Sequence, residues 1–169
     1  LGQPSALPGD SNSSATFDGV NDHIVVPHST TLNATGAVTV ELWAKRTKNA
    51  QWQVLVGKPG NGQSRLENYA IWFDSSNRLQ AYFGNGTTYV SAAWGTAVDT
   101  NWHHIAATYD NATARLYVDG VQRAQAASNV ALTPNALPLN IGRSNASSYF
   151  FGGSVDEVAV YPSALPAAR

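Results

Sequence analysis

The stretch that decides the fold reads Val38-Thr39-Val40-Glu41-Leu42-Trp43-Ala44-Lys45. All four even-numbered positions are apolar, and three of the four odd-numbered positions are polar. Because successive side chains of a β-strand point to opposite faces, this alternation predicts a strand with one buried face. Helix signals are nearly absent from the rest of the chain, since no long segment carries apolar residues at 3.6-residue spacing.

Short runs of the same kind recur along the chain, separated by polar turns. The strongest hairpin signal is Asp119-Gly120, which joins residues 115–118 to 121–124, because a two-residue turn with positive φ favours Asp-Gly. One sheet of so many strands would expose an apolar face, and stacking two sheets buries it. We therefore expect an all-β fold, a two-sheet antiparallel jelly-roll β-sandwich. Besides 38–45, the predicted strands are residues 15–18, 23–26, 52–56, 69–73, 79–83, 89–92, 103–109, 114–118, 121–126, 139–141 and 154–161.

Composition excludes several classes of protein. The 169 residues carry ten Lys and Arg against eleven Asp and Glu, and only 12% are charged, about half the usual share. Such a chain is a poor candidate for nucleic-acid binding, which needs clustered cations. No apolar run approaches the roughly 18 residues of a membrane span. The absence of Cys excludes disulfides and thiolate zinc sites.

Four segments together resemble laminin-G-like, concanavalin A-like jelly-roll domains. They are FDGVNDHIVVP (17–27), VTVELWAK (38–45), WHHIAATYD (102–110) followed by LYVDG (116–120), and FGGSVDEVAVY (151–161). In order and spacing they cover roughly residues 14–165. The resemblance implies a module of a large secreted or surface bacterial protein. Such modules commonly bind carbohydrate or act in adhesion beside a catalytic domain.

The expected domain organisation is simple. Residues 14–169 are expected to form a single laminin-G-like domain, and residues 1–13 to be a linker or an N-terminal extension. The chain begins without Met, in Leu1-Gly2-Gln3-Pro4, so we interpret it as a piece of a longer protein with other domains attached. The resemblance places that protein outside the cell or at the cell surface.

The resemblance also implies a structural calcium ion. Family members place the first and last strands side by side, and many bind calcium there through carboxylate, amide and carbonyl oxygens. On that basis we expect Asp18, Asn21, Asp22 and Asp156 to supply side-chain ligands. The alternative is that Asp18-Gly19 is simply a turn, with Asp156 serving as a hydrogen-bonding partner.

Aromatic residues are the candidates for a polysaccharide or glycan site, because the C–H groups of a pyranose stack on aromatic faces. Trp72 and Tyr82 alternate with core residues of their predicted strands, so they are expected on the outer, concave face of a sheet, where Tyr89 is a further candidate. Trp94 lies in a turn-rich segment and Tyr149 in a polar, aromatic loop. We predict that these four residues bind ligand, the alternative being ordinary sandwich packing.

No catalytic arrangement emerges from the sequence. Glycosidases need two carboxylates flanking the scissile bond, whereas Glu41, Glu67 and Glu157 are far apart and are expected to be solvated. There is also no Gly-x-Ser-x-Gly elbow of a serine hydrolase. We therefore expect a non-catalytic, lectin-like module. The alternative is a structural or adhesive scaffold that binds protein and has no affinity for sugar.

Overall fold

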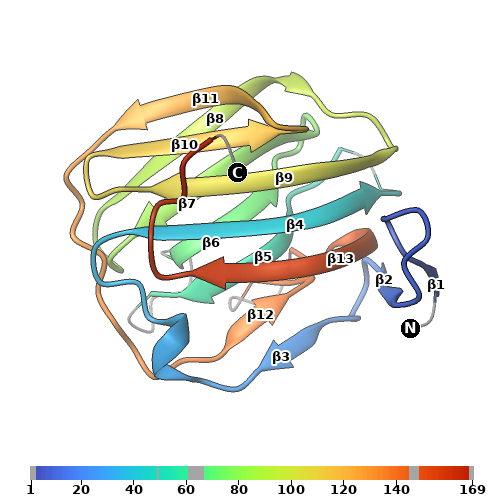
Figure 1. Ribbon diagram of the computed structural model, residues 1–169, viewed down its shortest axis with the longest axis horizontal. Coiled ribbons are helices and arrows are strands. Elements are labelled where there is room, and N and C mark those ends of the chain that lie inside the picture. The colour runs from blue at the N-terminus through green and yellow to red at the C-terminus, as the bar shows by residue number, and fades with distance from the viewer. Residues whose placement is uncertain (1–2, 49, 61–66, 145–148, 168–169) are drawn as a thin grey trace.

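The computed structural model describes residues 3–48, 50–60, 67–144 and 149–167. These residues form two antiparallel sheets packed face to face (Figure 1). The predicted jelly-roll β-sandwich is therefore confirmed. The seven-stranded sheet has the order β1 (Gln3–Pro4), β2 (Ser13–Asp18), β13 (Gly152–Tyr161), β4 (Val38–Arg46), β9 (Trp102–Tyr109), β10 (Thr113–Val118) and β11 (Val121–Ala127). The six-stranded sheet has the order β3 (Ile24–Val26), β12 (Leu139–Ile141), β5 (Gln53–Pro59), β6 (Glu67–Phe73), β7 (Arg78–Gly84) and β8 (Tyr89–Ala97); a short 3₁₀ helix, η1 (Thr30–Leu32), follows β3.

The alternation of apolar residues places the core between the sheets. In β4, Val38, Val40, Leu42 and Ala44 are all buried in it. The rings of Phe83 and Tyr109 stack across the core with centroids 5.2 Å apart, joining the two sheets. At the β10–β11 turn, Asp119 and Gly120 both have positive φ, as the hairpin prediction requires.

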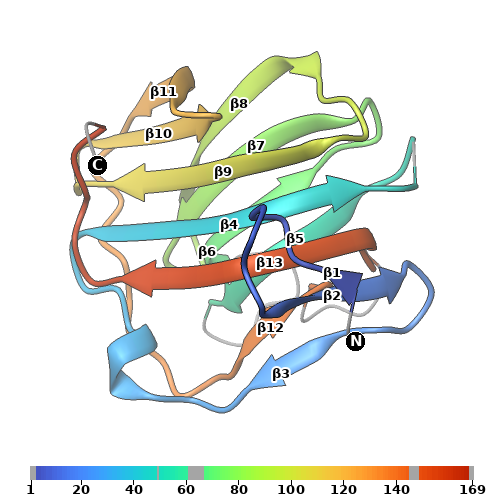
Figure 2. The ribbon, with the colours of Figure 1, turned by 45° about the vertical axis from the view of Figure 1, so that its right-hand side comes forward.

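The two ends of the chain meet in the seven-stranded sheet. Strand β13 lies between β2 and β4, so the last strand separates two early ones (Figure 2). Strand β1, which was not predicted, pairs with β2 through Gln3 opposite Ser14. The segment 1–13, expected to be a linker or an N-terminal extension, thus contributes an edge strand. Within the described ranges, no helix has the length and hydrophobicity needed to cross a lipid bilayer.

Candidate functional site

A row of aromatic rings crosses the outer face of the six-stranded sheet. Core residues Ile71 and Phe73 flank Trp72, so alternation turns its indole outward. The neighbouring ring centroids are 6.2 Å apart for Tyr149 and Trp52, 5.4 Å for Trp52 and Trp72, 5.4 Å for Trp72 and Tyr82, and 4.7 Å for Tyr82 and Tyr89. We call these five residues the aromatic row.

Solvent exposure varies along the aromatic row, and Tyr149 and Trp72 are half-buried. Trp52 is 37% exposed and Tyr89 is 58% exposed, whereas Tyr82 is only 3% exposed. Beside Trp52 and Tyr149 lies a hollow of about 300 Å³. None of its described lining residues is charged: they are Gly19, Ala50, Gln51, Trp52, Ser75, Tyr149 and Phe150.

Small, buried residues lie on the sheet next to the aromatic row. Asn140 pairs with Gly57 across the sheet, and Gly57 pairs with Ala70. Ala70 in turn pairs with Tyr82. Since directly paired residues point to the same face, Gly57 and Ala70 form a floor between the side chains of Asn140 and Tyr82.

A β-bulge brings a carboxyl group to this floor. Lys58 pairs with Tyr69, but the next residue of β5, Pro59, pairs with Glu67, so Asn68 is an extra residue in β6. Regular alternation would turn Glu67 toward the core with Tyr69. Instead, its Cδ atom lies 3.7 Å from the position that a Cβ atom on Gly57 would occupy, on the outer face.

The expectation that Glu67 is solvated is wrong. The residue is 5% exposed, and burial raises the pKa of its carboxyl group to about 7. Ionised carboxylates are strongly solvated in water, so burying one without a partner is costly. A buried carboxyl group with a raised pKa on a surface of aromatic rings is the kind of group found at functional sites.

Four buried polar atoms on this face have no hydrogen-bond partner among the residues that the structure describes. They are Glu67 Oε2, Trp72 Nε1, Tyr82 Oη and Asn140 Nδ2. Most buried polar atoms in folded proteins do have a partner, so four on one face need an explanation. All four atoms are closed to solvent in this structure.

Of the predicted ligand-binding residues, Trp72, Tyr82 and Tyr149 come together, and Trp94 does not. Trp94 belongs to β8, where it packs against the core, and the Arg123 guanidinium covers its ring at 4.9 Å. It shares a face with Val90 and Ala92, so alternation along β8 accounts for its position. Tyr89, the further candidate for this face, and Trp52, which was not predicted, complete the row.

The loop predicted to hold calcium is closed by its own hydrogen bonds. Asp18 Oδ1 accepts backbone N–H groups of Val20, at 2.7 Å, and of Asn21 and Asp22, and Asp22 Oδ2 accepts the N–H of Asp18. The bond from Val20 is the main reason that the pKa of Asp18 lies below its usual value. The ammonium group of Lys48 donates to the Gly19 carbonyl oxygen, so a cation of the chain itself lies at this loop.

Asp156 does not join that loop. Asp18 pairs with Gly152 in β13, and Asp156 lies four residues further along that strand, about 13 Å away at the usual rise per residue. Nowhere in the described ranges do three His, Cys, Asp or Glu side chains gather so that they could hold a metal ion. Asp18, Asn21, Asp22 and Asp156 therefore do not fit one shared calcium ion, and the alternative of a turn and a hydrogen-bonding Asp156 describes the geometry.

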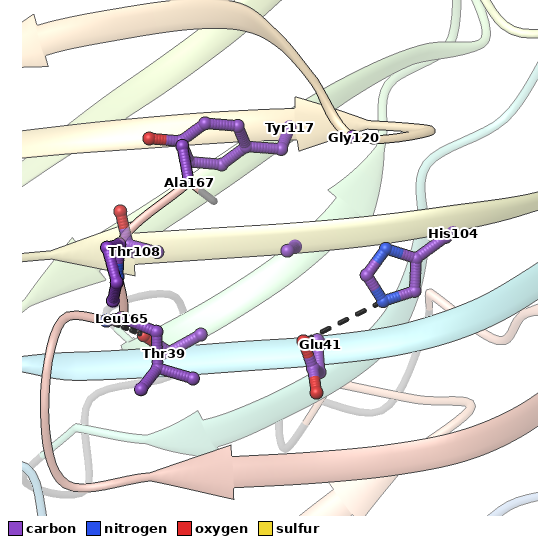
Figure 3. A pocket seen from close by; sticks show the side chains of 10 residues that line it. Thr39, Glu41, His104, Thr108, Tyr117, Gly120, Leu165 and Ala167 are labelled. Atoms are coloured by element: carbon purple, nitrogen blue, oxygen red, sulfur yellow. Dashed lines mark hydrogen bonds and ion pairs between the residues drawn. The ribbon is translucent and has the colours of Figure 1, made fainter. Parts of the chain in front are cut away.

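A second, smaller hollow lies on the outer face of the seven-stranded sheet (Figure 3). Its volume is about 80 Å³, and residues 165–167 of the C-terminal segment form one wall. Glu41 Oε2 lies 3.7 Å from His104 Nε2, and the Tyr161 hydroxyl donates to Glu41 Oε1. Glu41 is the one carboxylate among its described lining residues, so the two-carboxylate arrangement of a glycosidase is not formed here.

Comparison with known proteins identifies the fold independently. A family model described as the concanavalin A-like lectin/glucanases superfamily matches residues 18–169. No curated protein sequence is significantly similar to the chain.

Solved structures that include a carbohydrate-binding module, an arabinanase domain and a pentraxin share the fold at low sequence identity. Domain 4 of AbnA, a GH43 extracellular arabinanase from Geobacillus stearothermophilus solved with arabinotriose, has a TM-score of 0.72 and 20% identity, covering 96% of this chain and 76% of its own. The CBM40 module of a Ruminococcus gnavus sialidase, bound to α2,6-sialyllactose, has a TM-score of 0.69 and 17% identity over 96% and 95% of the two chains. A pentraxin from Limulus polyphemus has a TM-score of 0.64 and 16% identity over 90% and 76%.

Proposed function

The chain belongs to the concanavalin A-like lectin/glucanases superfamily, and we propose that within this family it is a non-catalytic carbohydrate-binding module. The observation that carries the proposal is the aromatic row, which ends at the hollow beside Trp52 and Tyr149. Sugar rings stack their C–H groups on such surfaces, while polar groups at the edge bind the hydroxyls. Two of the solved relatives were obtained with bound oligosaccharides, which supports extending this activity to the present chain.

The arrangement of acidic residues supports binding without catalysis. Hydrolysis of a glycosidic bond requires two carboxyl groups on opposite sides of that bond, at most about 10 Å apart. Among the described residues, Glu67 stands on the outer face of one sheet, and Glu41 stands on the outer face of the other. The thickness of the sandwich separates them, so no single substrate could contact both.

The setting of the module is also part of the proposal. We place it outside the cell or at the cell surface of a bacterium, attached to other domains of a longer chain. The arabinanase relative is itself an extracellular enzyme and contributes a comparable domain, which supports this placement. A module of this kind would hold a polysaccharide near a partner enzyme or the cell surface.

Affinity electrophoresis with a panel of polysaccharides tests the proposed function. We expect at least one glycan to retard the protein. Trp52→Ala should lose affinity roughly tenfold, because stacking of a sugar on one aromatic ring contributes on the order of 1 kcal/mol or more. Tyr117→Ala, on the outer face of the other sheet, is the matched control and should bind as wild type does. If no polysaccharide retards the wild-type protein, the module is instead a structural or adhesive scaffold.

A further inference from the structure

The loop of residues 18–22, which was predicted to hold calcium, borders two hollows. Gly19 is part of the wall of the hollow beside Trp52 and Tyr149, which we call the Trp52 hollow. Asp22, at the other end of the loop, is part of the wall of a further hollow of about 250 Å³, the His23 hollow. The described lining residues of the His23 hollow are Ala15, Thr16, Phe17, Asp22, His23 and Ile24.

A contact between two rings joins these hollows. Phe150 lines the Trp52 hollow, and the centroid of its ring lies 6.2 Å from that of His23, which lines the other hollow. His23 is exposed and Phe150 is half-buried, so both side chains are accessible from solvent. A chain molecule that occupies the Trp52 hollow can therefore continue past this ring pair into the His23 hollow.

Two exposed side chains give the His23 hollow hydrogen-bond acceptors. His23 Nδ1 lies 2.8 Å from the Asn21 carbonyl oxygen. Since a carbonyl oxygen only accepts, Nδ1 carries the hydrogen, and Nε2 of the neutral ring is the acceptor. Asp22 Oδ2 accepts the backbone N–H of Asp18 at 3.0 Å, and a carboxylate has about four lone-pair sites, so Asp22 can accept further hydrogens. Sugar hydroxyls can supply those hydrogens.

The loop that carries Asp22 is held in place by its own hydrogen bonds and by one lysine. Asp18 Oδ1 accepts three backbone N–H groups of the loop, and the Lys48 ammonium group donates to the Gly19 carbonyl oxygen. Because the loop is already ordered, binding a ligand beside it costs little conformational entropy.

We propose that the glycan site extends from the Trp52 hollow into the His23 hollow, where Asp22 and His23 accept hydroxyl hydrogens from a further unit of the same sugar chain. This inference rests on the proposed function, and it defines the ligand as a chain of two or more units rather than a single sugar. A hydroxyl that donates to the Asp22 carboxylate forms a charge-assisted hydrogen bond, which is stronger than a neutral one. The Trp52 and Phe150 rings remain available to the C–H faces of the chain.

NMR titration of the full chain, labelled with ¹⁵N, tests this extension of the site. The probes are the one-unit and four-unit fragments of whichever polymer, such as arabinan or xylan, retards the protein in electrophoresis. We expect both fragments to shift the signals of Trp52, and only the four-unit fragment to shift the amide signals of Asp22 and His23. The affinity of the wild-type protein should rise about tenfold from the one-unit to the four-unit fragment, because the longer chain adds hydrogen bonds to a charged acceptor.

Two variants separate the His23 hollow from the Trp52 hollow. His23→Ala removes the ring nitrogen, and Asp22→Asn removes the charge but keeps an oxygen for the N–H of Asp18. Each should bind the four-unit fragment about fivefold more weakly than wild type, the loss expected for one hydrogen bond, and bind the one-unit fragment equally well. Trp52→Ala should weaken the binding of both fragments. His28→Ala, which replaces another exposed histidine, should match wild type.

The outcomes separate this inference from the proposed function. If His23→Ala and Asp22→Asn bind the four-unit fragment as tightly as wild type, while Trp52→Ala does not, the module binds sugar but its site ends at the Trp52 hollow. The inference is also overturned if the four-unit fragment leaves the Asp22 and His23 signals of the wild-type protein unshifted, a result that does not depend on the folding of any variant. If no glycan retards the wild-type protein, the proposed function itself fails.

Discussion

The Asp156 carboxylate accepts a hydrogen bond from the hydroxyl of Ser5, 2.9 Å away and 151 positions earlier in the chain. The same oxygen accepts the backbone N–H of Ala6 at 2.8 Å. Asp156 is only 6% exposed, so these bonds lie largely out of water. The carboxylate predicted to bind a metal ion therefore fastens the N-terminal segment to the last strand instead.

Replacing Asp156 with Ala should release that segment. The variant also loses the bond from the Glu157 backbone N–H to Asp156 Oδ1, so three bonds to a charged acceptor disappear. We therefore expect the free energy of unfolding to fall by about 1–3 kcal/mol. Amide hydrogen exchange at Ala6 should become much faster, because its N–H would lose its acceptor. The control is Asp10→Ala, an exposed carboxylate in the same segment. Unchanged protection of the Ala6 amide in the Asp156 variant would show that the carboxylate does not hold the segment.

Chelation should leave the melting temperature unchanged. Lys48 Nζ lies 3.3 Å from the Gly19 carbonyl oxygen, and the lysine stem occupies the space that Cβ atoms on Gly19 and Gly152 would fill. The loop therefore has a cation of its own, and Asp156 lies too far away to complete a set of calcium ligands. Thermal unfolding with a chelator, and then with excess calcium, should give superimposable curves. A melting temperature that falls on chelation and recovers with calcium would restore the calcium prediction.

The sequence was a good guide wherever side chains alternate regularly. Val38 to Ala44 and the Asp119-Gly120 turn could be located from residue types alone, because one face of a strand is buried and a tight hairpin needs positive φ. The short strand at Gln3 and Pro4 has no such alternation and forms only because β2 offers it an open edge.

The candidate site was predicted only in part, and two particular residues show why. Trp72 was placed on the outer face because alternation holds there. Glu67 could not be placed, because the bulge at Asn68 breaks the period of two and depends on the partner strand. The separation of Asp18 from Asp156 was missed for a related reason. The sequence indicates that the two strands are neighbours, but their register cannot be derived from either strand alone.

Stability should decline as the pH rises through the titration of His103. Its Nδ1 lies 2.7 Å from Asp119 Oδ2 and its Nε2 lies 3.0 Å from Asp99 Oδ1. Burial alone would lower the pKa of His103, but hydrogen bonds and charge from the two carboxylates outweigh it and raise the pKa. A histidine with a raised folded pKa stabilises the protein fully below its unfolded pKa, near 6.5, and loses that contribution as the pH climbs through the folded value.

The measurement for His103 is the melting temperature between pH 5.5 and pH 9. The fall with rising pH should be smaller in His103→Gln, which keeps a hydrogen-bonding side chain but cannot be protonated. The control for general pH effects is His28→Gln, since His28 is exposed and forms no hydrogen bond or ion pair with the other described residues. Identical pH profiles for wild type and His103→Gln would contradict the assignment.

Removing the Tyr82 hydroxyl should affect binding and stability in opposite directions. The hydroxyl is buried without a hydrogen-bond partner, so Tyr82→Phe removes a desolvated polar group and should leave the free energy of unfolding unchanged or raise it by up to about 1 kcal/mol. Tyr69→Phe is the matched comparison, because the Tyr69 hydroxyl donates to the Leu32 carbonyl oxygen at 2.8 Å. That variant should lose about 1 kcal/mol of stability and keep its affinity for sugar. If the unpartnered hydroxyl binds a ligand, Tyr82→Phe should bind the same glycan several-fold more weakly, and its melting temperature should not fall below that of wild type. Equal affinity of the two variants for the glycan would mean that the ligand does not reach this part of the sheet.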